Sequence, residues 1–405
     1  MIQEDFMKKT VLVSCTAALF TTVLCAACSS TKITGAELHP TVASYIRTWP
    51  LGSTVEDQKA NIHWSAKELK GGSMTDLIIA FAHAKSDGTI YFPDVESTEH
   101  PFPGMWSEVT KIRKRYPNLK IHVSIGGWGA DQFSPVAADP AKRAVFVQSV
   151  LALVEEKKLD GIDIDWEYPV GPDWGEEIPH SPEDGANFIE MLSQIRTGFG
   201  ALEQKTGKKY SISIAAPGSS WYPQKVDVVK VASIVDTIKL MTYDYYGGWS
   251  STTGHHANLY NNPADPAWGG WSTAQSVDTY LAAGVPASKL IVGVAFYGRA
   301  WKGVADGGTN GLFRKFSEPA YPDGLSWPDL KKLLEPGSGY TQYWDDTAKA
   351  PYLYNGDIFV TYTDAREIAE IGAYVKQKGL GGVMVWEYGH DTDGELMKPL
   401  YDSLN

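Results

Sequence analysis

Residues 160–169, DGIDIDWEYP, place four acidic residues within eight positions of a segment that otherwise has the apolar pattern of a buried strand. Side chains alternate faces along an extended strand. Asp163, Asp165 and Glu167 therefore point to one face, whereas the two isoleucines and the tryptophan between them point to the other. The apolar face indicates that the back of this strand is covered. Three carboxyl groups on the opposite face predict a functional site.

Same-face side chains two positions apart lie roughly 6 to 7 Å from each other, because a strand rises by about 3.3 Å per residue. Carboxylates this close repel one another in a site sheltered from water, so at least one should keep its proton near neutral pH. A protonated acid beside ionised carboxylates is what cleavage of a glycosidic bond requires, since the leaving oxygen needs a proton and the sugar develops positive charge. The segment therefore favours a glycosidase.

Two other interpretations of the acidic segment are disfavoured. An exposed acidic strand would not need the apolar back face. A calcium-binding loop needs Gly at its sixth position and Glu at its twelfth, but the sixth position counted from Asp163 is Tyr168. We therefore expect no metal site here, and the chemistry that the acids favour needs no organic cofactor.

The composition is that of a folded protein with an acidic balance of charge. Of its 405 residues 43% are apolar and 21% are charged, and the formal net charge is -12, which is ordinary for a soluble globular protein. The negative charge disfavours nucleic acids and anionic membranes as partners. The chain also has 14 Trp, 21 Tyr and 13 Phe, whose rings can pack in the core or present flat faces to sugars.

The first 34 residues predict an export signal rather than part of the fold, because Lys8 and Lys9 precede an apolar run over 11–27. The sequence LCAAC at 24–28 resembles a bacterial lipoprotein signal, in which Cys28 would be lipidated; ordinary signal-peptide cleavage is the alternative. We expect an exported monomer, either a lipoprotein of the outer membrane or cell surface or a secreted protein. Its membrane contact would be limited to this anchor, and no cysteine pair would remain for a disulfide.

Eight short apolar runs rich in Val and Ile alternate with helical patterns. The predicted strands cover 42–47, 77–83, 120–125, 159–165, 210–215, 237–243, 289–297 and 382–386, and the clearest helices cover 106–116, 141–158, 183–206, 273–283 and 363–378. The helix after the fifth strand should be short. This alternation indicates a parallel sheet with right-handed crossovers, and eight units predict an α/β fold of the (β/α)8 TIM-barrel type. Catalytic residues of such barrels lie where strands end, as Glu167 does.

One interval interrupts the alternation. Residues 300–361, between the seventh strand and the helix that follows it, are rich in Gly, Pro, Tyr and Trp, and a structureless loop of this length is improbable in a compact domain. We predict a small α+β insertion subdomain that forms one wall of a cleft. The domain limits are then a signal and linker at 1–34, the barrel at 35–299 and 362–405, and the insertion at 300–361. Residues 172–181 and 255–270 are predicted as rim loops.

The acidic segment and four further motifs resemble glycoside hydrolase family 18, the chitinase-type family, in its subgroup with an insertion after the seventh strand. The resemblance covers nearly the whole chain after about residue 42. Asp160, Asp163, Asp165 and Glu167 match the DxxDxDxE signature. The other matches are Ser124-Ile-Gly126-Gly127-Trp128 on the third strand, Met241-Thr-Tyr243-Asp244 on the sixth, Tyr297-Gly-Arg299 at the end of the seventh, and Trp386 on the eighth.

The resemblance implies a retaining chitinase, endo- or exo-acting, that hydrolyses β-1,4-linked N-acetylglucosamine polymers, with chitin or chito-oligosaccharides as its partners. Such enzymes use the N-acetyl group of the substrate as the nucleophile. Glu167, nearest the rim, would act as general acid and then as base. Asp165 would orient the acetamide N–H and share a proton with Asp163 or Glu167. Tyr243 would hydrogen-bond the acetamide oxygen.

The same resemblance implies substrate contacts, each of which has core packing as its alternative. Trp386 would form the floor beneath the distorted sugar, and Trp128 would stack on the leaving-group side. Asp244 would contact the same sugar or hold Glu167 in place. Further substrate-binding residues would be Tyr45, Phe81, Met241, Tyr297 and Arg299, and the supporting residues of the acidic strand would be Asp160 and Ser124.

Two pairs of residues outside the motifs also carry predictions. Trp221 and Trp249, on rim loops, are candidate sugar platforms, with core packing equally favoured. His255 and His256 are adjacent and therefore poorly placed to bind one metal ion together. For these histidines we predict a solvated loop.

Two alternative functions remain open. An endo-β-N-acetylglucosaminidase acting on N-glycans would use the same acids, but such relatives generally lack the insertion. A non-catalytic lectin would bind chitin fragments with the same barrel and would usually lack the terminal acid. Because this chain keeps Glu167 together with Asp165 and Tyr243, the sequence favours the enzyme.

Overall fold

The structure, a computed structural model, describes residues 40–49, 65–96, 102, 104–171, 178–266 and 271–405. The predicted export signal with Cys28 lies outside these residues, as do parts of the two predicted rim loops. Within the described ranges, no helix combines the length and the apolar character that crossing a membrane requires.

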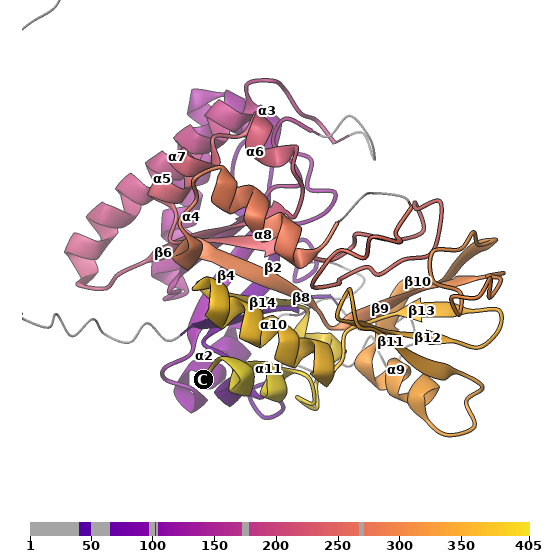
Figure 1. Cartoon of the computed structure of the whole chain (residues 1–405). Helices are drawn as coiled ribbons and strands as arrows, with labels where there is room; N and C mark the ends of the chain where they lie inside the picture. The colour runs from indigo at the N-terminus through magenta and orange to yellow at the C-terminus, as the bar shows by residue number, and fades with distance from the viewer. Residues whose placement is uncertain (1–39, 50–64, 97–101, 103, 172–177, 267–270) are drawn as a thin grey trace, which may run out of the picture. The chain divides into compact units, whose positions relative to one another are not determined.

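Eight parallel strands form a closed barrel, which confirms the predicted fold class (Figure 1). Neighbouring strands follow the order β1-β14-β8-β7-β6-β5-β4-β2, and β1 pairs with β2 to close the ring. The strands are β1 (Thr41–Arg47), β2 (Asp76–Ala84), β4 (Lys120–Gly126), β5 (Gly161–Asp165), β6 (Ser211–Pro217), β7 (Thr237–Met241), β8 (Leu290–Ala295) and β14 (Gly382–Trp386), and the short β3 (Ile90–Tyr91) pairs antiparallel with β2.

From β2 onward helices connect successive barrel strands, and the predicted helices are confirmed. Asp139, Ser272 and Asp364 cap the first turns of α4, α8 and α10 by accepting backbone N–H bonds. The helices are α2 (Met105–Arg115), α3 (Phe133–Ala138), α4 (Pro140–Glu156), α5 (Asp184–Thr206), α6 (Tyr222–Lys225), α7 (Val228–Ile234), α8 (Thr273–Ala282), α10 (Ala365–Lys378) and α11 (Met397–Leu404), with 3-10 turns η2 (Gly71–Ser73), η3 (Ala287–Lys289) and η4 (Tyr388–His390). As expected, α6 and α7, which follow β6, are short.

The period of two along each strand decides which side chains pack against the helices and which face the barrel interior. On β5, Ile162 and Ile164 belong to the large apolar cluster between strands and helices. Asp163 points the other way, because it contacts side chains of β1, β4, β6 and β7. Asp165 shares this inward face of β5. The predicted alternation is therefore observed, and it places acids inside the barrel.

A second sheet is formed by residues between β8 and α10 in the chain, where the insertion is predicted (Figure 1). Its five antiparallel strands follow the order β10-β9-β13-β12-β11. They are β9 (Tyr297–Lys302), β10 (Glu318–Ser326), β11 (Thr341–Asp345), β12 (Ala350–Tyr354) and β13 (Phe359–Thr361), with α9 (Trp327–Leu334) after β10. The domain limits themselves stay predictions.

The predicted seventh strand, 289–297, is wrong at its end. The barrel strand β8 stops at Ala295, and the Phe296 N–H still donates to the Trp386 carbonyl at 2.9 Å. From Tyr297 onward the chain pairs antiparallel with β10 and β13, with Arg299 opposite Thr361. The long apolar run thus contains two strands of different sheets. Tyr297 and Arg299 belong to the second sheet, not to the barrel.

Candidate active site

The acidic segment lies at the carboxyl end of β5, and its first acid is fixed inside the barrel. Asp163 has an exposed fraction of 0%. Its Oδ2 accepts hydrogen bonds from Tyr45 Oη (2.7 Å) and Ser124 Oγ (2.8 Å). Its Oδ1 accepts one from Ser213 Oγ (2.6 Å) and pairs with Lys239 Nζ (3.0 Å). Donors on both oxygens hold this carboxylate in one orientation.

The partners of Asp163 also decide its charge. Burial alone would raise the pKa of Asp163, because an apolar interior disfavours a carboxylate. The Lys239 ammonium and the hydrogen bonds from Ser213 and Tyr45 outweigh burial, so the pKa lies below its usual value. Asp163 is therefore the ionised member of the group.

The next two acids hold protons more tightly. Burial raises the pKa of Asp165 well above its usual value, and the charges of Glu167 and Asp163 raise it further. Burial also raises the pKa of Glu167 to about 7; a hydrogen bond from Tyr168 opposes this shift and the charge of Asp244 adds to it. Among the described residues Asp165 Oδ1 is buried and has no hydrogen-bond partner. Such an oxygen is free to bond a ligand.

Two glycines of the SxGG match let β4 approach this segment closely. Gly126 has φ 125°, and a Cβ there would lie 2.0 Å from the Asp165 carbonyl oxygen. Gly127 has φ 89°, and its Cβ would lie 2.6 Å from the Phe81 ring. The Gly127 N–H donates to the Asp165 carbonyl at 2.8 Å. Only glycine fits both positions, and they fix the backbone that carries Asp165.

Asp244, next to Tyr243 after β7, collects partners from other parts of the chain. Its Oδ1 accepts hydrogen bonds from Tyr297 Oη (2.7 Å) and Arg299 Nε (2.6 Å) and lies 3.6 Å from His256 Nδ1. Its φ of 59° lies in the left-handed region, where Asp is among the better-tolerated residues. Burial would raise the pKa of Asp244, but His256 and Arg299 hold it well below its usual value. Asp244 is therefore a second fixed anion.

Aromatic rings from several strands gather beside the acids. Trp386 stacks on Phe81 at a centroid distance of 5.6 Å and tilts against Tyr45 at 5.7 Å and Trp49 at 6.4 Å. Met241 packs against the same interior cluster. The predicted substrate-binding residues of β1, β2, β7 and β14 are thus brought together.

Tyr243 packs against the same interior cluster. Its ring meets that of Tyr297 edge to face at 6.2 Å, and its hydroxyl lies 3.8 Å from Met384 Sδ. Charges of Asp165, Glu167 and Asp244 all act on this hydroxyl, which places it among the acids. Burial, the largest effect, raises the pKa of Tyr243 well above its usual value, so the hydroxyl keeps its proton.

Two tryptophans near the site are exposed to an unusual degree. Trp128 and Trp249 are 54% and 65% exposed, and the Arg299 guanidinium lies over the Trp249 ring at 4.9 Å. Trp221 instead is partly buried, with its ring 5.6 Å from Tyr168. Exposed indole faces are available to a ligand, so core packing does not account for Trp128 or Trp249.

Asp160 is the signature residue that lies apart from the others. It precedes β5, at the amino end of the strand. Its Oδ2 accepts hydrogen bonds from the Ile121 N–H (2.8 Å) and from Arg113 (2.9 Å), and its Oδ1 pairs with Lys208 (2.8 Å). Asp160 therefore ties β5 to β4 and does not reach the carboxyl rim.

The prediction of a solvated loop at His255 and His256 is wrong. Their exposed fractions are 2% and 0%. His255 Nε2 lies 3.1 Å from Asp345 Oδ2 on β11, and His256 lies against Asp244. Two adjacent polar residues have no apolar periodicity, and the partners that bury them come from the second sheet, about 40 and 90 positions further along the chain.

The sequence did not lead us to predict Lys239 or Ser213 as site residues, although both contact Asp163. Their hydroxyl and ammonium groups also contact each other. A signal was present for Lys239, which lies two positions before Met241 in the otherwise apolar strand TIKLM. A lysine on the interior face of a buried strand needs an anionic partner, and Asp163 was the available one.

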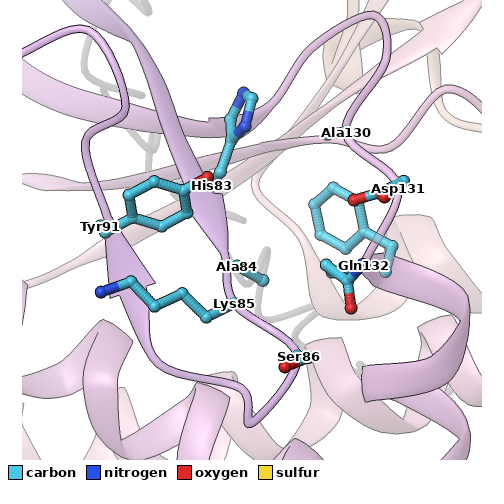
Figure 2. A pocket seen from close by; sticks show the side chains of 9 residues that line it. His83, Ala84, Lys85, Ser86, Tyr91, Ala130, Asp131 and Gln132 are labelled. Carbon is cyan, nitrogen blue, oxygen red and sulfur yellow. The ribbon is translucent and has the colours of Figure 1, made fainter. Parts of the chain in front are cut away.

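A cavity of about 400 Å³ lies between the β2–β3 hairpin and the segment that leads from Trp128 into α3 (Figure 2). His83, Lys85 and Tyr91 line one side, and Asp131 and Gln132 line the other. In the part of the chain that the structure describes, no group of three or more His, Cys, Asp or Glu side chains could hold a metal ion.

The closed barrel with a buried carboxyl group at the carboxyl rim defines a class of barrel enzymes, and comparison with known proteins identifies the family. Residues 44–391 match the model of glycosyl hydrolases family 18. The chain belongs to this family.

Relatives and solved structures agree with this assignment. The chain is 39% identical to Chitinase A1 of Niallia circulans over 324 residues, which is 76% of this chain and 46% of the relative. It is 32% identical to Chitinase B of Serratia marcescens over 358 residues, covering 73% and 69% of the two chains. The structure of a family 18 N-acetylglucosaminidase from Paenibacillus barengoltzii matches with a TM-score of 0.77 at 33% identity, covering 90% of this chain and 99% of the other. The chain spans about half the length of the first curated relatives it matches, 46% and 56%.

Proposed function

We propose that this protein is a retaining chitinase that hydrolyses β-1,4-linked N-acetylglucosamine polymers by substrate-assisted catalysis. One observation carries the proposal: Glu167, with a pKa of about 7, stands beside Asp165, whose buried Oδ1 has no partner among the described residues. A proton donor and an unsatisfied acceptor next to each other suit a substrate that offers a glycosidic oxygen and an amide N–H. Curated relatives named chitinases support the same substrate class.

In the proposed reaction Glu167 donates its proton to the leaving glycosidic oxygen. The acetamide oxygen of the sugar attacks the anomeric carbon as the bond breaks, which gives a cyclic oxazolinium-type intermediate. Glu167, now ionised, takes a proton from water, which opens the ring with retained configuration. Asp165 accepts the acetamide N–H and positions the amide for attack, while Tyr243 donates to the acetamide oxygen.

The remaining groups have supporting roles in this proposal. Asp163, held ionised by Lys239, keeps a negative charge behind Asp165 and so stabilises the developing cation. Asp244 raises the pKa of Glu167 through its charge. Trp386 lies under the sugar that is cleaved, and Trp128, half exposed at 54%, stacks on the leaving-group side. Tyr45, Phe81, Met241, Tyr297 and Arg299 complete the pocket wall.

A second candidate activity is release of single sugars from chain ends. The solved structure described as an N-acetylglucosaminidase matches this chain over 99% of its length at 33% identity, which supports this candidate. Both candidates use Glu167 and Asp165 in the same way. Mass spectrometry of the products from end-labelled chito-hexaose separates them, because an N-acetylglucosaminidase yields monosaccharide from the first turnover.

The deciding experiment is Glu167→Gln, which keeps the shape of the side chain and removes its proton chemistry. The rate of chito-oligosaccharide cleavage should fall by about 10² to 10⁴, while calorimetry should show oligosaccharide binding close to that of the wild type. A variant with near-normal turnover would disprove the assignment. Wild-type protein that binds the oligosaccharide without cleaving it would establish a lectin instead.

For the location of the protein we propose export with Cys28 as a lipid anchor, on the strength of the LCAAC sequence. Cys28→Ser should move the protein from the membrane fraction to the soluble fraction of the cell envelope or the medium. A protein that is soluble with Cys28 in place would indicate ordinary signal cleavage.

We also propose that the second sheet is the insertion subdomain of the family subgroup.

A further inference from the structure

His256 lies where Asp244 meets the second sheet, and the orientation of its ring is fixed. Its Nε2 lies 3.1 Å from the Tyr297 carbonyl oxygen. A carbonyl only accepts, so Nε2 carries a proton and donates. The backbone N–H of His256 donates to Thr361 Oγ1 (3.3 Å), and its carbonyl accepts from the Tyr245 N–H (3.0 Å). Contacts with β9, β13 and the segment after β7 therefore hold this residue in place.

The other ring nitrogen faces a carboxylate without a hydrogen bond. His256 Nδ1 lies 3.6 Å from Asp244 Oδ1 and has no hydrogen-bond partner among the described residues. In the neutral ring Nδ1 carries a lone pair, which cannot bond to a carboxylate. In the protonated ring Nδ1–H would point at Oδ1 and form a charge-assisted hydrogen bond. Protonation of the His256 ring would thus create a strong attraction between Nδ1 and Asp244 Oδ1, which do not hydrogen-bond when the ring is neutral.

That attraction would compete with the existing partners of the same oxygen. Asp244 Oδ1 already accepts from Tyr297 Oη and Arg299 Nε. A third donor would draw Oδ1 toward the His256 ring and would partly cancel the negative charge that acts on Glu167. The titratable and charged groups that face His256 are Asp244, Arg299 and Tyr297, whose ring centroid lies 5.1 Å from that of His256. The Tyr297 carbonyl and Thr361 Oγ1 are its other polar neighbours.

We propose that His256 is a positioning residue for the hydrolytic reaction, which leaves Asp244 beside Glu167 when its ring is neutral and draws Asp244 away when its ring is protonated. The proposal rests on the hydrolase function proposed above. Burial lowers the pKa of His256, whereas the Asp244 carboxylate raises it, and the net shift is downward. His256 should therefore take up its proton at a pH below the usual range of histidine. Activity should fall there because the displaced Asp244 no longer holds Glu167 in place, while Glu167 itself keeps its proton in acid.

The test compares two histidine variants by the pH profile of kcat/KM on a soluble chito-oligosaccharide. His256→Gln keeps a donor for the Tyr297 carbonyl but cannot take up a proton. Its acid-side midpoint should lie about one pH unit below that of the wild type, with an unchanged basic side. His255→Gln is the matched control, because His255 is equally buried and pairs with Asp345 at 3.1 Å instead of with Asp244. Its profile should equal that of the wild type.

The proposal would be overturned if His256→Gln were active and kept the acid-side midpoint of the wild type. It would also be overturned if the acid-side midpoint of His255→Gln moved by the same amount as that of His256→Gln. A second measurement needs no turnover: NMR titration of carbon-13-labelled histidine in the wild type and in Asp244→Asn. The pKa of His256 should fall in Asp244→Asn, because the carboxylate that favours the imidazolium is gone; an unchanged value would also overturn the proposal. A wild type inactive on chito-oligosaccharides would instead disprove the proposed function and would leave this titration informative.

Discussion

At the residue scale, the surroundings of each acid in the DGIDIDWEYP segment decide its proton affinity. Asp163 has donors and a cation around it, so its pKa is low. Asp165 is buried between two carboxyl groups, so its pKa is high. Glu167, beyond the end of the strand, lies between these extremes at about 7. An enzyme that needs one acid to hold a proton beside a neighbouring charge requires this graded order.

The pKa of Glu167 predicts the basic side of the activity profile. A general acid must be protonated in the free enzyme, so kcat/KM should fall as the pH rises through about 7. Asp244→Asn removes a negative charge that raises this pKa, so the basic midpoint should move to lower pH. The measurement is kcat/KM against pH for both proteins on one soluble oligosaccharide. A midpoint that moves upward in the variant would contradict the role of Glu167.

The acids were predictable from the sequence, whereas their partners were not. A period of two in residues 160–169 is local, so the common face of Asp163 and Asp165 could be predicted directly. Lys239 and His256 act through partners far away in the chain, at Asp163 and Asp244. Such pairing follows from strand order and from the second sheet, which no local pattern contains. The roles of the acids stay predictions until they are tested.

At the element scale, β5 is held by side chains at its middle and at its amino end. At its middle Asp163 bonds to Ser124 on β4, Ser213 on β6 and Lys239 on β7. At its amino end Asp160 bonds to the backbone of β4. Around β5, polar contacts between neighbouring parallel strands thus replace the apolar side chains that usually fill a barrel of this type, whereas the interior cluster on β1, β2, β8 and β14 is apolar. The strand that carries the acids therefore cannot shift without breaking these polar contacts.

Removal of the buried cation should cost much stability. Lys239→Met leaves the Asp163 carboxylate buried without its counterion, so the free energy of unfolding should fall by about 3 to 5 kcal/mol. Denaturant unfolding at pH 7 measures it. The control is Lys205→Met, because Lys205 pairs with Glu155 on the surface, where such pairs contribute about 0 to 1 kcal/mol. If the free energy of unfolding fell by the same small amount in both variants, the buried pair would contribute no more to stability than the surface pair.

The same variant carries a pH signature. The folded-state pKa of Asp163 lies below its usual value, so its pairing stabilises the folded state at neutral pH. This contribution is lost as the pH falls through the usual carboxyl range toward the folded-state pKa. The stability difference between the wild type and Lys239→Met should therefore narrow in acid. A difference that widens there would contradict the ionised state of Asp163.

At the amino end of β5 we expect a substitution to lower stability without lowering turnover. Asp160→Ala removes the acceptor of the Ile121 N–H and the partner of Arg113 and Lys208. Loss of such hydrogen bonds should lower the free energy of unfolding by about 1 to 3 kcal/mol. Because Asp160 lies at the end of β5 away from Glu167, kcat should stay within about twofold of the wild type. A folded variant with kcat reduced tenfold or more would place Asp160 in the reaction.

At the scale of the whole chain, the barrel and the second sheet share the site. The eight-strand alternation made the barrel predictable, because each unit repeats the same local pattern. The end of β8 and the start of β9 could not be predicted within the apolar run over 289–297, because one long strand and two consecutive strands have the same composition. As a result, Tyr297 and Arg299 approach Asp244 from a sheet whose strand order the sequence did not reveal.

The contribution of the second sheet can be measured at Arg299. Arg299→Ala removes the donor that binds Asp244 Oδ1 at 2.6 Å. Hydrogen bonds to charged groups contribute about 1.5 to 3 kcal/mol, so kcat/KM on chito-oligosaccharides should fall by about 10- to 100-fold. Lys302→Ala, on the same strand, removes only a surface pair with Glu318 and should leave kcat/KM unchanged. Both variants truncate a long side chain of β9, so a loss of kcat/KM confined to Arg299→Ala assigns the effect to the contact with Asp244. Equal losses of kcat/KM in the two variants would contradict this assignment.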